Sequence, residues 1–152
     1  MKNNMIKQFI ALVILLASPL VMAQQNFDDI EIQALKVRDN IYMLVGSGGN
    51  ITVQIGAEGV LVIDTQYAEL SDKILAKIRE LSDKPLRYII NTHHHGDHVG
   101  GNENIKNAGF TLSGGNVGAA LSTAGQGATI LAHENVLLNL ASDENVSTEL
   151  WP

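Results

Sequence analysis

The fold of this chain is decided by a strand-like run, Leu86-Arg87-Tyr88-Ile89-Ile90-Asn91, that leads directly into Thr92-His93-His94-His95-Gly96-Asp97-His98. The second segment holds four of the chain's five histidines together with one carboxylate. Neutral imidazole and carboxylate are the ligands that zinc and similar divalent metals prefer. Packing in a core gives no reason to place so many polar side chains directly after an apolar run. The sequence therefore predicts a metal site at the end of a strand.

The segment upstream of this run predicts a strand and a helix that lead into it. Val60-Leu61-Val62-Ile63 is apolar on both faces, as a central strand is, and it ends at Asp64. Apolar residues then recur at helical spacing, and they are Leu70, Ile74, Leu75, Ile78 and Leu81. This helix is expected to end near residues 82–85. Ligands commonly bind beyond the carboxyl ends of the strands in such a unit, where Asp64 and the histidines are expected.

The remaining elements are predicted from short alternating or apolar runs. We expect strands over residues 30–37, 41–45, 51–55 and 129–132, and helices over residues 103–107 and 134–141. Asn102 is expected to cap the first of these helices. Residues 111–127 are rich in Gly, Ser and Ala, which favours a flexible surface loop, with a lid over the metal site as the alternative.

The N-terminal residues 1–23 have the composition of a secretory signal peptide. Two lysines precede an apolar run, and Val21-Met22-Ala23 fits a cleavage site. An uncleaved membrane anchor is the alternative, but the apolar run is short for a bilayer span. We therefore expect a periplasmic or secreted protein whose mature part, residues 24–152, forms one domain that does not stay attached to the membrane.

Composition limits the partners and the chemistry of this domain. The formal net charge is −6, so nucleic-acid binding is not expected, because nothing would offset phosphate repulsion. Cysteine is absent, and any metal site must therefore use histidine and carboxylate.

The spacing within the histidine motif suggests how it could hold metal. Residues two apart on an extended segment point the same way, so His93 and His95 can bind one metal together. Gly96 is expected to permit a sharp turn that directs Asp97 and His98 toward an adjacent position. This arrangement suits the two neighbouring metals of a hydrolytic site. His94 should face elsewhere.

The motif His93-x-His95-x-Asp97-His98 resembles the signature of the metallo-β-lactamase superfamily of metal-dependent hydrolases. The order of strand, Asp64, helix, strand and signature is similar as well, and the resemblance covers about Val37 to Ser142. It implies an α+β chain with one mixed or antiparallel sheet and its helices, which is the N-terminal half of a four-layer αββα sandwich. It also implies a zinc-dependent hydrolase in which metal-activated water attacks an ester, amide or lactam-like bond of a small-molecule substrate.

The resemblance also implies a role for each residue of the site. His93 and His95 would bind the first of two zinc ions, and Asp97 and His98 the second. Asp97 would in addition orient or deprotonate the attacking water. Asp64 would support the metal loop from behind without binding metal. His133 is not a ligand position in the family, so we interpret it as a helix-start or surface histidine.

The sequence departs from the family pattern after His98. Family members take further ligands from a second half of the fold, whereas only His133 and Asp143 are at hand for that role here. We therefore expect residues 24–152 to be an incomplete domain with an exposed apolar sheet face, which leads to poor solubility or to a homodimer. Two further hypotheses are an inactive remnant that binds metal weakly and a module that buffers metal through the histidine run alone.

Overall fold

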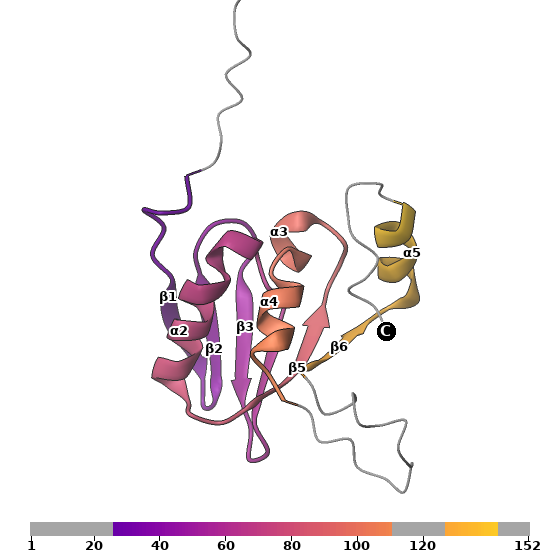
Figure 1. Cartoon of the computed structure of the whole chain (residues 1–152). Helices are drawn as coiled ribbons and strands as arrows, with labels where there is room; N and C mark the ends of the chain where they lie inside the picture. The colour runs from indigo at the N-terminus through magenta and orange to yellow at the C-terminus, as the bar shows by residue number, and fades with distance from the viewer. Residues whose placement is uncertain (1–25, 111–126, 143–152) are drawn as a thin grey trace, which may run out of the picture.

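A six-stranded mixed sheet forms the frame of the part of the chain that the computed structural model describes, residues 26–110 and 127–142 (Figure 1). Its strands are β1 (Gln33–Arg38), β2 (Ile41–Val45), β3 (Ile51–Ile55), β4 (Val60–Ile63), β5 (Leu86–Asn91) and β6 (Thr129–Ala132). They lie side by side in sequence order. The pairs from β1 to β4 are antiparallel, and β4–β5 and β5–β6 are parallel. The predicted signal peptide and nearly all of the predicted loop 111–127 lie outside the described residues.

Helices follow strands β4, β5 and β6 along the chain, and two of them cover one face of the sheet. They are the 3₁₀ turn η1 (Ala68–Leu70), α2 (Ser71–Leu81), α3 (Gly96–Val99), α4 (Asn102–Asn107) and α5 (Glu134–Ser142). Helices α2 and α4 lie side by side in front of the sheet in Figure 1. The α+β class expected from the sequence is therefore confirmed. Among the described helices, none is both long enough and apolar enough to cross a membrane.

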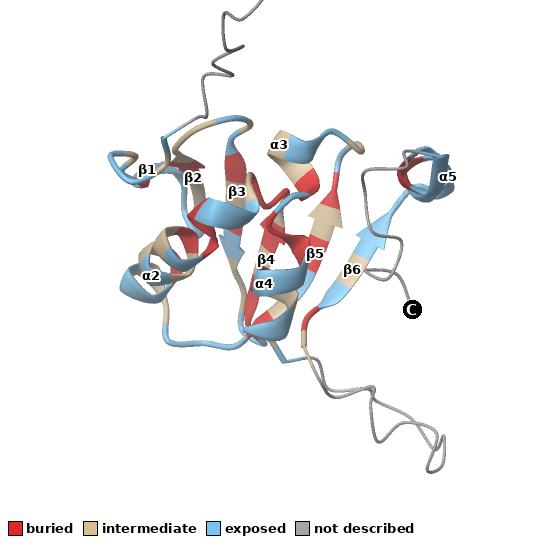
Figure 2. Cartoon of the chain, turned by 45° about the horizontal axis from the view of Figure 1, so that its top comes forward, coloured by how far each residue is buried: buried red, intermediate tan, exposed pale blue. Residues whose placement is uncertain are grey.

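The hydrophobic core lies between α2, α4 and the covered face of the sheet (Figure 2). Ile74 and Ile78 of α2 and Ile105 of α4 are buried against alternate residues of the strands. The buried strand residues are Leu44, Ile51, Val53, Val60, Val62, Leu86 and Ile89. Each fully buried aliphatic side chain contributes about 1.5–3 kcal/mol, so this layer is what fixes β4 and β5, the two strands that lead to the histidine motif.

The opposite face of the sheet is apolar and is left open by the described residues. Strand register aligns one row of side chains across it: Leu35, Met43, Thr52, Ile63, Ile90 and Leu131. The residues at the two ends of this row, Leu35 and Leu131, are 48% and 47% exposed. Tyr88 on β5 is 41% exposed. The expected exposed sheet face is thus present.

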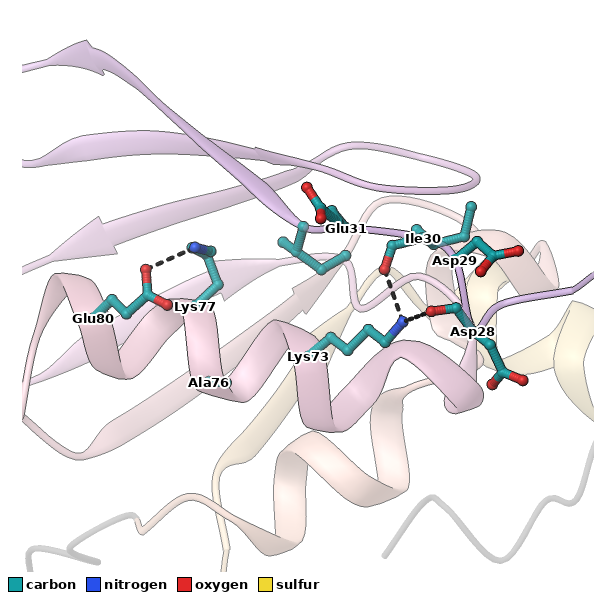
Figure 3. Close-up of a pocket in the computed structure, with 9 residues that line it drawn as sticks. Asp28, Asp29, Ile30, Glu31, Lys73, Ala76, Lys77 and Glu80 are labelled. Atoms are coloured by element: carbon teal, nitrogen blue, oxygen red, sulfur yellow. Dashed lines mark hydrogen bonds and ion pairs between the residues drawn. The ribbon is translucent and has the colours of Figure 1, made fainter.

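Strand β1 begins three residues later than the sequence pattern predicts. Residues 26–32 do not pair with β2 but lie along α2, where Lys73 holds them. Its Nζ donates hydrogen bonds to the carbonyl oxygens of Asp28 and Ile30 at 2.6 and 2.8 Å (Figure 3) and to that of Phe27 at 2.9 Å. The alternating pattern that starts at Ile30 predicts the start of β1 wrongly, because Lys73, far away in the sequence, binds the backbone carbonyls of this segment.

Candidate metal centre

The predicted site lies at the carboxyl ends of β4 and β5, two adjacent parallel strands. Asp64 directly follows β4, with φ of 66°, and is only 3% exposed. Its backbone N–H donates to the Ile90 carbonyl at 2.8 Å, which ties the two strand ends together. Thr92, directly after β5, donates from its backbone N–H to Asp64 Oδ1 at 2.8 Å and from its hydroxyl to Asp64 Oδ2 at 2.7 Å. A single buried carboxylate therefore sets the direction in which the histidine loop leaves the sheet.

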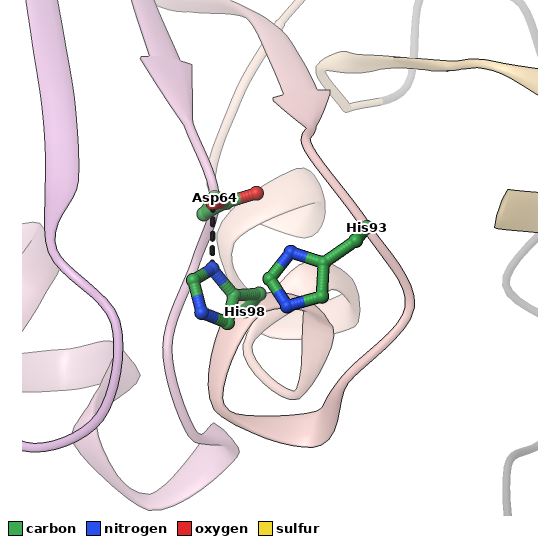
Figure 4. A group of neighbouring side chains, drawn as sticks. All are labelled: Asp64, His93 and His98. Atoms are coloured by element: carbon green, nitrogen blue, oxygen red, sulfur yellow. Dashed lines mark hydrogen bonds and ion pairs between the residues drawn. The ribbon is translucent and has the colours of Figure 1, made fainter.

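The same carboxylate orients His98, which lies in the single-turn helix α3. His98 Nδ1 is 2.7 Å from Asp64 Oδ2 (Figure 4). A carboxylate only accepts hydrogen bonds, so Nδ1 carries the proton and Nε2 keeps a free lone pair. Asp97 Oδ2 is 3.5 Å from that Nε2. A histidine that donates to a carboxylate through one nitrogen and offers the other is the arrangement found behind metal-binding histidines.

His93 lies against His98, and His95 lies against His93. The ring centre of His93 is 4.0 Å from that of His98 and 4.8 Å from that of His95. The Thr92 hydroxyl lies 3.0 Å from His93 Nδ1. Because this hydroxyl donates its hydrogen to Asp64, it accepts one from His93, which leaves the lone pair on His93 Nε2. Both His93 and His98 thus keep a nitrogen able to bind metal.

Burial lowers the pKa of His93, and the neighbouring His98 and His95 lower it further. Asp64 and Asp97 act against this shift. A lowered pKa keeps the imidazole neutral near pH 7, which is the form that binds metal.

Asp64 could be counted as a ligand or as a support, and its hydrogen bonds favour the support. One ligand atom each from Asp64, His93 and His98 lies within 4.8 Å of the others. Both Asp64 oxygens, however, already accept hydrogen bonds from Thr92 or His98. The nitrogens left free on His93 and His98, with the Asp97 carboxylate 3.5 Å from the latter, are donor types suited to zinc. The division of the ligands between two metals stays a prediction.

Two details of the loop differ from the sequence-based interpretation. Gly96 does not have a positive φ, and a Cβ added there would meet nothing within 4 Å, so the turn does not require glycine. The turn is instead the start of α3, whose N-cap residue is His95. His94 is not isolated from the cluster either, because its ring centre is 4.8 Å from that of His95.

A buried amide pair behind the loop was missed by the sequence analysis. Asn102 Nδ2 donates to Asn91 Oδ1 at 2.9 Å, and Asn91 Nδ2 donates to Asn102 Oδ1 at 3.1 Å. The Thr65 hydroxyl also donates to Asn102 Oδ1 at 3.0 Å. Asn102 was expected to cap α4, but its side chain makes no cap hydrogen bond, and the N-cap residue is Gly101. The pair joins the two ends of the histidine loop.

A second feature is the segment Gly46-Ser47-Gly48-Gly49-Asn50, here called the glycine loop, whose close approach to Asp97 and His98 was not predicted from the sequence. Gly48 has φ of 85°, and a Cβ there would lie 2.8 Å from the Cβ of Asp97. A Cβ on Gly49 would collide with the His98 ring. The run of glycines is the signal in the sequence that could have indicated such close backbone approach.

His133 has the role expected of a helix-start histidine. It is exposed, and its Nδ1 accepts a hydrogen bond from the backbone N–H of Asn135 at 3.2 Å in the first turn of α5.

The segment 111–126 is outside the described residues, but the residues that flank it, Phe110 and Gly127, pair with each other. The backbone N–H of Phe110 donates to the carbonyl of Leu86 at the start of β5. This is the end of the strand opposite to the histidines.

A cavity of 570 Å³ lies away from the histidines, between residues 28–32 and α2 (Figure 3). Its charged lining is acidic apart from Lys73 and Lys77. Lys73 is bound to backbone carbonyls, and Lys77 is 2.7 Å from Glu80. Lys73 therefore serves to hold residues 26–32 on α2.

Comparison with known proteins places this site in a family. A family model described as the metallo-beta-lactamase superfamily matches residues 44–137. The chain is 44% identical over 45 residues to a linear primary-alkylsulfatase from a Pseudomonas species, covering 29% of this chain and 8% of that protein. It is 40% identical over 78 residues to a hydroxyacylglutathione hydrolase from Pelagibacter ubique, covering 50% of this chain and 28% of that protein.

The fold agrees with solved structures. A subclass B3 metallo-beta-lactamase from Bradyrhizobium japonicum superposes with a TM-score of 0.53 at 23% identity, covering 77% of this chain and 42% of that one. The chain thus spans less than half of each of these relatives. Because the family model covers more than half of the sequence, including Asp64 and the whole histidine motif, the chain belongs to the metallo-beta-lactamase superfamily.

Proposed function

We propose that this chain carries the histidine-rich part of an exported, zinc-dependent hydrolase, which cleaves an ester, amide or lactam-like bond in a small molecule. The observation that carries the proposal is the convergence of His93 and His98, each with a nitrogen left free, beside the Asp97 carboxylate. This is a prepared donor set rather than a random histidine tract, because Asp64 fixes the orientation of His98 and of the loop.

Each residue has a distinct part in the proposed reaction. His93 and His95 would hold one metal, and Asp97 and His98 would hold a second. Zinc bound there would lower the pKa of water and polarise the bond under attack. Asp97 would orient the attacking water or accept its proton, and Asp64 would keep His98 in the required tautomer.

The bond that is cleaved is proposed from the relatives. The curated proteins that match in sequence carry the names of alkylsulfatases and of a hydroxyacylglutathione hydrolase. The β-lactamases match in fold, most of them at low identity. A substrate panel should therefore place alkyl sulfate and other esters first and β-lactams second.

Asp97→Ala tests the mechanism. The zinc-loaded variant is expected to lose hydrolysis by at least a hundredfold while its circular dichroism is unchanged, because general-base work of this kind contributes about 10²–10⁴ in rate. Asp72→Ala, which removes an exposed carboxylate from α2, is the matched control and should retain full activity. Turnover in Asp97→Ala equal to that of the control would refute the role.

Metal stoichiometry separates this function from the alternatives. Two tightly bound zinc ions with turnover support the hydrolase, whereas one loosely bound metal without turnover on any substrate supports an inactive remnant or a metal buffer.

Mass spectrometry of the protein from the periplasm tests export, since cleavage after Ala23 leaves Gln24 as the first residue.

A further inference from the structure

Gln66 occupies an unfavourable position beside the metal centre. It is completely buried, and its φ of 52° lies in the left-handed region. Its Oε1 has no hydrogen-bond partner among the described residues. A buried polar atom without a partner costs about 1–3 kcal/mol. An apolar side chain would avoid that cost, so the amide must provide something that an apolar group cannot.

What the amide provides is a hydrogen bond to the glycine loop. Gln66 Nε2 donates to the carbonyl oxygen of Gly49. On the other side of the residue, the Gln66 carbonyl accepts a hydrogen bond from Gly101 N–H at 2.9 Å, directly after α3. Gln66 therefore links the glycine loop to the segment that carries the histidines.

The link matters because Gly49 lies against the His98 ring. A Cβ on Gly49 would collide with three atoms of that imidazole. The N–H of Gly49 also donates to the Asp97 carbonyl at 3.3 Å. Asp64 holds Nδ1 of His98 on one side, and Gly49 limits the tilt of the ring on the other. The direction of Nε2 thus depends on both contacts.

We propose that Gln66 is a positioning residue of the metal centre: it holds the glycine loop against the His98 imidazole and so fixes the direction of Nε2. The effect on metal binding rests on the function proposed above, but the effect on the loop does not. Such supporting contacts typically change metal affinity by 10–100-fold.

Gln66→Met tests the proposal, because methionine keeps the length of the side chain and removes the donor. In metal-free protein, hydrogen exchange at the Gly49 amide should become at least tenfold faster while exchange in β3 and β4 is unchanged. Zinc affinity measured by titration calorimetry should fall about tenfold. The matched control is Asn40→Ala. It removes a similar hydrogen bond, from the Asn40 side-chain amide to the Ile55 carbonyl at 2.7 Å, at the end of the strands far from the histidines. It should change neither quantity.

Folded Gln66→Met with Gly49 exchange and zinc affinity within twofold of wild type would overturn the proposal. So would faster exchange throughout the sheet with unchanged zinc affinity, since that indicates a general loss of stability. If the variant does not fold, hydrogen exchange in the wild type tests the proposal. A Gly49 amide that exchanges without protection in the wild type means that the glycine loop is not held in place, which overturns the proposal. If wild type binds no zinc, the proposed function fails, and the exchange comparison still tests the link from Gln66 to Gly49.

Discussion

At the scale of single residues, Asp64 controls more of the site than any ligand does. Its two oxygens accept hydrogen bonds from the Thr92 backbone, the Thr92 hydroxyl and His98. The Thr92 hydroxyl in turn decides which nitrogen of His93 is free. One buried carboxylate thus sets the tautomers of two histidines, one directly and one through Thr92.

The lowered pKa of His93 leads to a prediction about pH. Its pKa is lower in the folded chain than in the unfolded chain, so acidification protonates the unfolded state first. The contribution of His93 to stability is complete above the ordinary histidine pKa and is lost as the pH falls through the folded value. An NMR titration of metal-free protein should show His93 titrating below free histidine. In His95→Asn its pKa should rise, because one neighbouring positive charge is removed.

His133→Asn is the control for this titration, since His133 is an exposed residue at the start of α5. It should leave the His93 titration unchanged. A His93 pKa at or above the ordinary value in wild type would contradict the prediction.

The candidate metal ligands were predictable from the sequence, whereas the residues that hold them in place were not. Imidazole and carboxylate at ligand spacing have few other uses, so His93, His95, Asp97 and His98 stand out without any structure. Gln66 and Asn102 do not, because their partners are far apart in the chain and amides serve many roles. Asn102 was interpreted as a cap, and only the fold shows that it pairs with Asn91.

At the scale of elements, the spacing of apolar residues predicted the bounds of strands and helices wherever packing against the core determines the structure. The bounds of β2 to β6 agree with the predicted runs, and α2 ends at Leu81 as expected. The prediction failed at β1, where a polar contact decides. Lys73 on α2 attracts the carbonyls of residues 27–30, and no local pattern contains that information.

Lys73→Met is expected to weaken the attachment of residues 26–32 to α2. Methionine keeps most of the stem of the lysine but donates no hydrogen bond. Since hydrogen bonds to a charged group contribute about 1.5–3 kcal/mol, the free energy of unfolding in urea should fall by about that amount. Lys77→Met on the same helix is the control, because Lys77 forms only a surface pair with Glu80. That pair is worth about 0.2–0.5 kcal/mol. Equal losses in the two variants would show that Lys73 does not act as a clamp.

At the scale of the whole molecule, the two faces of the sheet are unequal. One face is sealed by α2 and α4 (Figure 2), and the other carries a row that is apolar except at Thr52 and that the described residues leave uncovered. The candidate metal centre lies beside both faces, at the carboxyl ends of β4 and β5.

The mature part, residues 24–152, is predicted to associate with a second copy of itself through this open face. Monomeric proteins rarely expose apolar patches larger than a few hundred Å², and a second copy of the face offers a complementary apolar surface. Light scattering behind size exclusion should show dimers or larger species at micromolar concentration. Leu35→Lys with Leu131→Lys should shift the chain toward monomer, because two charges then face each other across the contact. Leu138→Lys is the control, since Leu138 is 63% exposed but lies on α5. A wild-type chain that stays monomeric, or a control that dissociates it equally well, would show that the sheet face does not drive association.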